Sequence, residues 1–194
     1  MTPEHQRYVT CLHEAGHAVL AMRLGKPMSI TMRRQGRVTR VYASPHIVAE
    51  IYDGIGGATR HSCLHLGRID MAAMAWAGGT AVAELCLPST CDYLGVWDLV
   101  SGPDRADFMA QGLTPRAQTR AMNLARKMVL QRHTEILRLA AQIYRHGAVA
   151  ICWTDDHWDV SPVSRMDARP SEAWLKRVSP YMDDSPTTSP IALP

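Results

Sequence analysis

The chain has 194 residues, of which 46% are hydrophobic and 20% are charged, which is typical of a globular domain that needs no disulfide or metal staple. The net charge of +3 is small and the arginines are scattered, so the sequence favours neither a nucleic-acid partner nor a charged membrane surface. The five cysteines are odd in number and include no Cys-x-x-Cys pair, which argues against a zinc ribbon or a secreted disulfide framework and favours reduced thiols in the cytoplasm. A signal-peptide-like apolar run and a stretch of about 18 apolar residues are both missing from the sequence, so we expect no membrane span.

The first predicted element is a helix over residues 3–24. Thr2 is a suitable N-cap and Pro3 suits the first helical position. Gly25, followed by Pro27, predicts the end of the helix. Apolar residues recur at helical spacing and predict its core face: Tyr8, Cys11, Leu12, Ala15, Ala18, Val19 and Met22.

Two segments of different character follow this helix. Residues 28–44 alternate between apolar and polar types, which predicts one or two strands, and these strands are a candidate edge for pairing with an extended peptide. The glycine-rich residues 45–67 are expected to form a long loop. A second helix is predicted over residues 70–87, and the Gly78-Gly79 pair within it indicates close packing because glycine weakens a helix.

The second half of the chain is predicted to be mainly helical. A short helix is expected to begin near Asp104, after an irregular stretch over residues 88–103. Thr114 and Pro115 then predict the start of one long amphipathic helix that runs to about Tyr144.

Less regular structure is predicted toward the end of the chain. A short strand is expected over residues 148–153, followed by an acidic surface turn that contains Asp155, Asp156, His157 and Asp159. From residue 161 the chain is rich in Pro, Ser and Thr, which predicts an extended or partly disordered tail. We therefore expect one domain over residues 1–160 and a tail over residues 161–194, with a mainly α fold that includes a small β-hairpin (α+β).

The segment His13-Glu14-Ala15-Gly16-His17 carries the clearest chemical signal. Residues four apart lie on one face of a helix, so His13 and His17 can bind one ion through imidazole nitrogens, a ligand type that suits Zn²⁺. Glu14 is expected beside the metal, where its carboxylate can take a proton from a water that the metal activates. This His-Glu-x-x-His arrangement is that of metal-dependent peptidases, and two ordinary histidines matched by chance are the alternative interpretation.

Three segments resemble the M41 peptidases, the zinc-dependent proteolytic domain of the FtsH family. They are HEAGHAVLA at residues 13–21, AGGTAVAEL at residues 77–85 and VSGPD at residues 100–104. The resemblance covers roughly residues 5–145 and implies a mostly helical, zincin-like peptidase fold. The sequence contains neither a G-x-x-x-x-G-K-[ST] phosphate loop nor a membrane anchor, so the ATPase module of the family is not expected here.

A catalytic zinc site normally has three protein ligands and one open position. The resemblance implies that the third ligand is an aspartate at a helix start, a place that Asp104 occupies here. A plain helix cap is the alternative role for Asp104. Because the loop before Asp104 is shorter than the family pattern, Asp107 is the alternative ligand. Glu84 is the third candidate, because a glutamate on a later helix supplies this ligand in another class of zinc peptidases. The resemblance instead implies a structural or supporting role for Glu84.

A second pair of histidines four residues apart, His61 and His65, lies in the glycine-rich segment. No glutamate follows His61, so loop histidines without a metal are the simpler interpretation. Cys11 is expected in the core and not as a nucleophile.

The sequence therefore predicts a zinc endopeptidase that acts on polypeptides. Without an ATPase it would cut flexible or unfolded segments, or depend on a separate unfoldase. The alternative is a catalytically silent binding or regulatory module with a peptidase fold. No nucleic-acid or membrane partner is expected, and a homo-oligomer is left open.

Overall fold

The computed structural model describes residues 2–25, 28–34, 37–43, 46–52, 56–61, 66–86, 96–154 and 157–163. Within these ranges the fold is mainly α, with a four-stranded antiparallel sheet and a separate two-stranded hairpin. The predicted mainly α, α+β class is thus confirmed. Among these residues, no helix has both the length and the apolar character that crossing a membrane requires.

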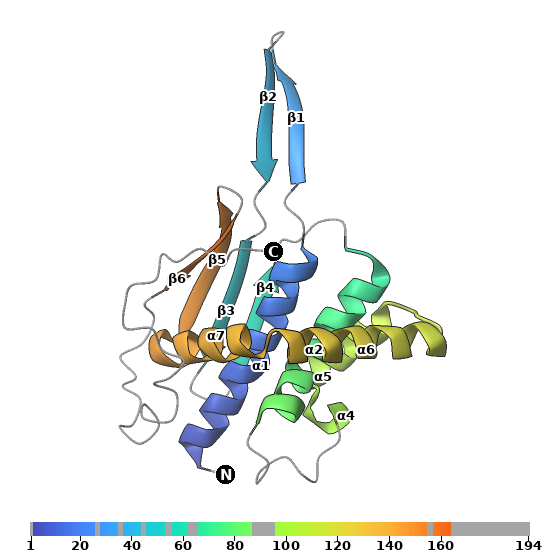
Figure 1. The fold of residues 1–194 in the computed structure, drawn as a ribbon, viewed down its shortest axis with the longest axis vertical. Coiled ribbons are helices and arrows are strands. Elements are labelled where there is room, and N and C mark those ends of the chain that lie inside the picture. Colours follow the sequence, from blue (N-terminus) through green and yellow to red (C-terminus); the bar gives the residue numbers. More distant parts are fainter. Residues whose placement is uncertain are drawn as a thin grey trace.

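The elements follow one another along the chain as shown in Figure 1. In chain order they are α1 (Pro3–Leu24), β1 (Met28–Arg34), β2 (Arg37–Ala43), β3 (His46–Tyr52), β4 (Gly56–His61), α2 (Arg68–Leu85), α4 (Val96–Leu99), α5 (Gly102–Ala110), α6 (Pro115–Gln131), α7 (His133–His146), β5 (Ala148–Thr154) and β6 (His157–Pro162).

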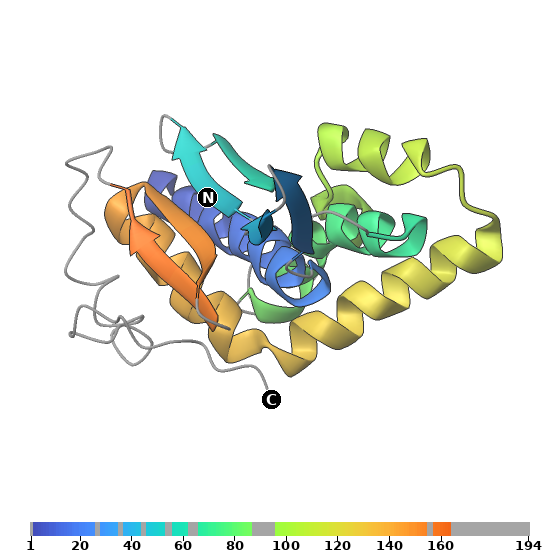
Figure 2. The same ribbon diagram turned by 90° about the horizontal axis from the view of Figure 1, so that it is seen from above.

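Helix α1 lies at the centre of the molecule and has the bounds that the sequence predicts. The Thr2 side chain accepts a hydrogen bond from the backbone N–H of His5, and the N–H of Gly25 closes the last turn on Ala21. The helix packs against α2, α7, β3 and β4, with the sheet on one side and α2 on the other (Figures 1 and 2). Because it has neighbours on several sides, α1 also buries residues outside the predicted core face, including Glu14 and Leu20.

Strands β1 and β2 form the predicted hairpin, with Met28 opposite Ala43 and Arg34 opposite Arg37. In Figure 1 this hairpin projects away from the rest of the fold. It forms a sheet of its own, separate from the larger sheet beside α1.

The prediction of a long loop over residues 45–67 was wrong, because strands β3 and β4 lie there. The strand order of the larger sheet is β4-β3-β5-β6, antiparallel throughout. Ile47, Ala49 and Ile51 alternate along β3 and are all buried, which is the period-two pattern of a strand with one covered face. The neighbouring glycines concealed this short pattern, since glycine is depleted in strands.

The prediction of a single long helix after Pro115 was wrong. Two helices, α6 and α7, lie there and meet at Arg132. Arg132 leaves helical geometry at φ −117° and ψ 20°, and its guanidinium contacts Glu135, which also binds Arg23 of α1.

The predicted acidic surface turn is only partly described. His157 and Asp159 lie in strand β6 and contact each other, whereas residues 155 and 156 lie outside the described residues.

The remaining predictions for the end of the chain are only partly covered by the structure. Strand β5 confirms the strand predicted over residues 148–153. Strand β6 continues to Pro162, past the expected boundary at residue 160. The rest of the predicted tail, residues 164–194, lies outside the described residues, as does the first half of the stretch predicted to be irregular, residues 88–95. The second half of that stretch was predicted wrongly, because it contains α4 and the start of α5.

Helices α1 and α2 approach closely at small residues. A Cβ atom added to Gly16 would lie 2.7 Å from the Ala81 Cβ and 2.8 Å from the Ala77 carbonyl oxygen. A Cβ on Gly79 would lie 2.6 Å from a methyl group of Val100. The close packing that the Gly78-Gly79 pair predicts is therefore confirmed within the chain itself.

We expect Gly16→Ala to destabilise the fold by about 1–3 kcal/mol, because the added methyl group collides with α2 backbone. Helix propensity alone predicts the opposite effect, an increase in the free energy of unfolding of about 1 kcal/mol. Urea unfolding followed by circular dichroism measures the difference. The matched control is Gly102→Ala, whose Cβ would have no atom within 4 Å. A Gly16→Ala variant as stable as the wild type would contradict this account of the helix contact.

Candidate metal centre

Two histidines of α1 and one aspartate of α5 meet in the interior of a cleft. His13 Nε2 lies 2.9 Å from Asp104 Oδ2, and His17 Nε2 lies 3.3 Å from the same oxygen. The two Nε2 atoms are 3.1 Å apart, and the three side chains are only 12–18% exposed. The fold brings His13 and Asp104 together, although 91 residues separate them in the sequence.

The three side-chain atoms could hold one metal ion. All three candidate ligand atoms lie within 4.8 Å of one another. Ligands about 2.0–2.1 Å from a tetrahedral metal ion stand about 3.3 Å apart, which is close to the separations observed between these atoms. Among the residues that the structure describes, no other group of three or more His, Cys, Asp or Glu side chains converges in this way.

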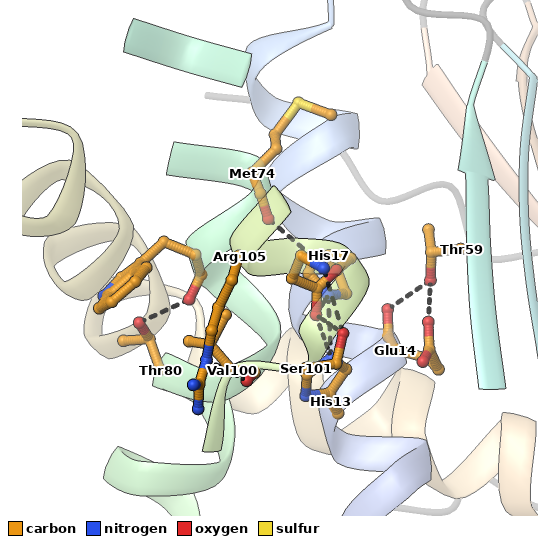
Figure 3. Close-up of polar contacts among 11 residues, drawn as sticks. His13, Glu14, His17, Thr59, Met74, Thr80, Val100, Ser101 and Arg105 are labelled. Atoms are coloured by element: carbon orange, nitrogen blue, oxygen red, sulfur yellow. Dashed lines mark hydrogen bonds and ion pairs between the residues drawn. The ribbon is translucent and has the colours of Figure 1, made fainter. Parts of the chain in front are cut away.

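The ring of His17 is oriented by a backbone group. Its Nδ1 lies 2.7 Å from the carbonyl oxygen of Met74 on α2 (Figure 3). A carbonyl oxygen can only accept, so Nδ1 donates and carries the proton. In the neutral imidazole, Nε2 is then the unprotonated nitrogen. This is the form in which a histidine ligates a metal, and such an orienting hydrogen bond is typical of metal sites.

The start of α5 orients Asp104 in a similar way. Ser101 is the N-cap of this helix and accepts a hydrogen bond from the backbone N–H of Asp104. The Ser101 hydroxyl also lies 2.7 Å from Asp104 Oδ2 and donates to it. The carboxylate is therefore fixed at the helix start, where the helix dipole favours a negative charge.

Opposite shifts in pKa reflect the contact between the histidines and the carboxylate. Burial raises the pKa of Asp104, but the hydrogen bonds from His13 and His17 lower it by more, so the pKa lies well below its usual range. Burial lowers the pKa of His17, but the hydrogen bond and charge of Asp104 raise it by more, with a smaller contribution from Glu14. A proton shared between imidazole and carboxylate thus satisfies the site without a metal, and a metal ion would displace it.

Glu14 stands beside this group and is held by strand β4. Its side chain is 5% exposed, and its Oε2 lies 2.8 Å from the hydroxyl of Thr59 (Figure 3). A Cβ atom added to Gly57 would lie 2.7 Å from Glu14 Oε1. The strand therefore leaves room for the carboxylate at Gly57 and fixes it from Thr59.

Helix α2 comes equally close to the two histidines. A Cβ atom added to Gly78 would collide with His17 Nε2 and lie 2.6 Å from His13 Nε2. Gly78 therefore provides the space that the two imidazoles occupy, which explains why a helix tolerates a glycine here.

A cleft of about 740 Å³ opens onto the group. One wall is apolar and comes from α2, through Met71, Met74 and Ala75. The opposite wall is β4, with residues 56–59 and His61. Burial lowers the pKa of His61, and the charge of His17 lowers it further.

The site residues predicted from the sequence have different places in this structure. His13, His17 and Asp104 come together, with Glu14 beside them. Asp107 lines the cleft but does not belong to the three-residue group.

The weaker candidates are separate from the group. Glu84 lies 2.7 Å from the Arg126 side chain and links α2 to α6, a structural role. His61 ends β4 and lines the cleft, whereas His65 lies outside the described residues. The predicted burial of Cys11 is confirmed, and burial raises the pKa of its thiol.

Sequence reasoning missed the residues that orient the site. The Ser-x-x-Asp spacing of Ser101 and Asp104 is a helix-start signal that could have identified the N-cap. Thr59 and Gly57 gave no such signal, because their roles depend on a strand that was not predicted.

Comparisons of the chain with protein-family models, with curated proteins and with solved structures gave no match. The likeness to the M41 peptidases therefore depends on the three sequence segments that carry it.

We expect Asp104→Ala to remove most bound metal, because two histidines alone leave the ion without its third protein ligand. Elemental analysis after dialysis against Zn²⁺ measures the bound metal. Asp107→Ala is the matched control on the same helix and should retain it. Asp104 would not be the third ligand if only Asp107→Ala lost the metal, or if both variants kept it.

We expect Gly78→Ala to weaken metal binding by about 10–100-fold, the range seen when residues around metal ligands are changed. The added methyl group would push both imidazoles out of their present positions. Competition with a chromophoric chelator measures the affinity, and Gly102→Ala again adds a methyl group in open space. Unchanged affinity in Gly78→Ala would contradict a site in this position.

Proposed function

We propose that the chain is a zinc-dependent endopeptidase of the M41 type, in which His13, His17 and Asp104 hold Zn²⁺ and Glu14 is the general base. The observation that carries this proposal is the position of a buried carboxylate, Glu14, next to three converging ligand atoms in an open cleft. Two imidazoles and one carboxylate, with a position left open, are a ligand set typical of catalytic zinc.

In this proposal each side chain of the site has a distinct role in peptide hydrolysis. A zinc ion in this ligand set supplies Lewis acidity and a water of lowered pKa. The Glu14 carboxylate accepts a proton from the attacking water and delivers it to the nitrogen of the leaving amine. Thr59 positions Glu14 through the hydroxyl contact at 2.8 Å, so the base is oriented before substrate binds.

The substrate in this proposal is an extended polypeptide bound along β4. Residues 28–42 were predicted as an edge that pairs with a peptide, and this stays a prediction; β1 and β2, which lie there, form a two-stranded sheet of their own. It is β4 that stands at the end of the strand order and lines the cleft. A peptide added to such an edge gains backbone hydrogen bonds over several residues.

The proposed activity does not depend on ATP. No phosphate loop occurs in the sequence, so the substrates are flexible or unfolded segments, or proteins delivered by a separate unfoldase. The three described cysteines, Cys11, Cys86 and Cys152, form no disulfide, which favours action in the cytoplasm. A homo-oligomer is compatible with this function and is not required by it.

One observation favours a second candidate, a silent regulatory module with the same fold. The two histidines and Asp104 already satisfy one another through hydrogen bonds of 2.9–3.3 Å. A buried polar group of this kind can be structural, because each member has a partner without any metal. In that case the purified protein would contain no metal and would not take one up.

We expect Glu14→Gln to lower kcat/KM for cleavage of unfolded polypeptides by at least about 100-fold, the usual contribution of a general base. Bound zinc should stay at the wild-type level, because Glu14 is not one of the converging ligands. Fluorogenic peptide libraries and unfolded proteins provide the assay, with elemental analysis in parallel. Glu4→Gln, in the exposed first turn of the same helix, is the control and should cleave normally. Zinc-loaded wild-type protein that leaves every substrate intact would refute the proposed function.

A further inference from the structure

Alternate residues of β4 face the candidate metal centre. Gly57 leaves space for the Glu14 carboxylate and Thr59 contacts it. Successive side chains of a strand point to opposite faces, so His61, two residues beyond Thr59, lies on the same face. It lines the same cleft.

His61 shares the cleft with His13, His17 and Asp104, whereas Thr59 contacts Glu14. Burial lowers the pKa of His61, and the charge of His17 lowers it further. His61 does not belong to the converging group of His13, His17 and Asp104.

The two ring nitrogens of His61 have different surroundings. Nδ1 is enclosed and has no hydrogen-bond partner among the described residues, so no acceptor in that part of the chain holds a proton there. This leaves Nε2 as the nitrogen to carry the N–H of the neutral ring. His17 has the opposite arrangement, because the Met74 carbonyl oxygen holds its proton at Nδ1.

We propose that His61 is a catalytic residue of this peptidase, whose Nε2–H donates a hydrogen bond to the carbonyl oxygen of the scissile peptide as that oxygen gains negative charge. This inference rests on the proposed function. His61 gives up no proton in the step, since it donates only a hydrogen bond. Both the neutral and the protonated imidazole can present an N–H at Nε2, so the role does not depend on titration of the ring.

The position on β4 suits this role. A peptide paired with the strand edge lies along the cleft, between the face that carries Thr59 and the ligands on α1. Glu14 then accepts the proton of the attacking water near one end of this strand face, and His61 contacts the carbonyl oxygen near the other end. Fixed donors aimed at a developing charge are commonly among the largest contributions to catalysis.

The experiment compares His61→Ala with His61→Gln in the full chain loaded with zinc. We expect His61→Ala to lower kcat by about 100-fold, the usual effect of removing one such donor, with KM changed less than about threefold. His61→Gln keeps an N–H near the place of Nε2 and should restore part of the rate. His133→Ala removes an exposed histidine at the start of α7 and should have no effect.

Binding measurements give a readout that does not depend on turnover. A phosphinic peptide, whose tetrahedral oxygens imitate the charged carbonyl oxygen, should bind His61→Ala about 10–100-fold more weakly than the wild type. An ordinary peptide bound to Glu14→Gln should lose no affinity when His61→Ala is added. Zinc content should be the same in all variants.

Several results would overturn the role of His61. They are a His61→Ala variant with wild-type kcat, a His61→Gln variant no better than His61→Ala, and a loss of zinc that parallels the loss of rate. If the wild type cleaves and His61→Ala cleaves equally well, only this inference fails. If zinc-loaded wild type cleaves nothing, the proposed function fails and this inference fails with it.

Discussion

The close approach of α1 and α2 is the constraint on which the rest of the structure depends. The two helices meet at Gly16 and Gly78, where a single added methyl group would collide with the opposite helix or its side chains. This spacing lets the Met74 carbonyl oxygen reach the ring of His17. It also leaves the two imidazoles pointing toward the start of α5, where Asp104 meets them. The geometry of the candidate metal centre is therefore a result of helix packing as much as of the His-Glu-x-x-His spacing, which determines only that both histidines share a face.

Strand β4 and the helices α2 and α5 orient different side chains of the site. Helices α2 and α5 orient the ligands, through Met74 and Ser101. Strand β4 orients the residues assigned to proton transfer and charge stabilisation, through Thr59 and the position of His61. Because the two sets come from different layers of the fold, a change in one set can leave the other in place. If the proposed function is correct, substitutions in the two layers should therefore affect metal content and catalytic rate separately.

The parts of the fold that could be predicted from the sequence are those with strong local signals. Helix α1 has a cap, a proline at its first position and a glycine at its end, so its bounds were predicted correctly. Asp104 could be chosen only through the likeness to a known family, because nothing local distinguishes a ligand from a helix cap. Strands β3 and β4 pair with each other locally, but they lie in a glycine-rich segment, and the further pairing of β3 with the distant β5 leaves no signal in so short a stretch of sequence. The break at Arg132 was missed for a related reason, since Glu135 is bound there by Arg23, 112 residues away in the chain.

The long sequence separations around α1 have a consequence for how the protein is made. Arg7 of this helix donates to the Tyr144 carbonyl oxygen, across 137 residues, and the guanidinium also lies over the Tyr144 ring. On the ribosome, the face of α1 that packs against α7 stays uncovered until α7 has been made, and contacts of such long range form slowly. During that interval the nascent helix is open to unwanted association, as is typical of transiently exposed apolar surfaces. A chaperone that shields the first helix during translation would therefore raise the yield of folded protein more than one that acts after release.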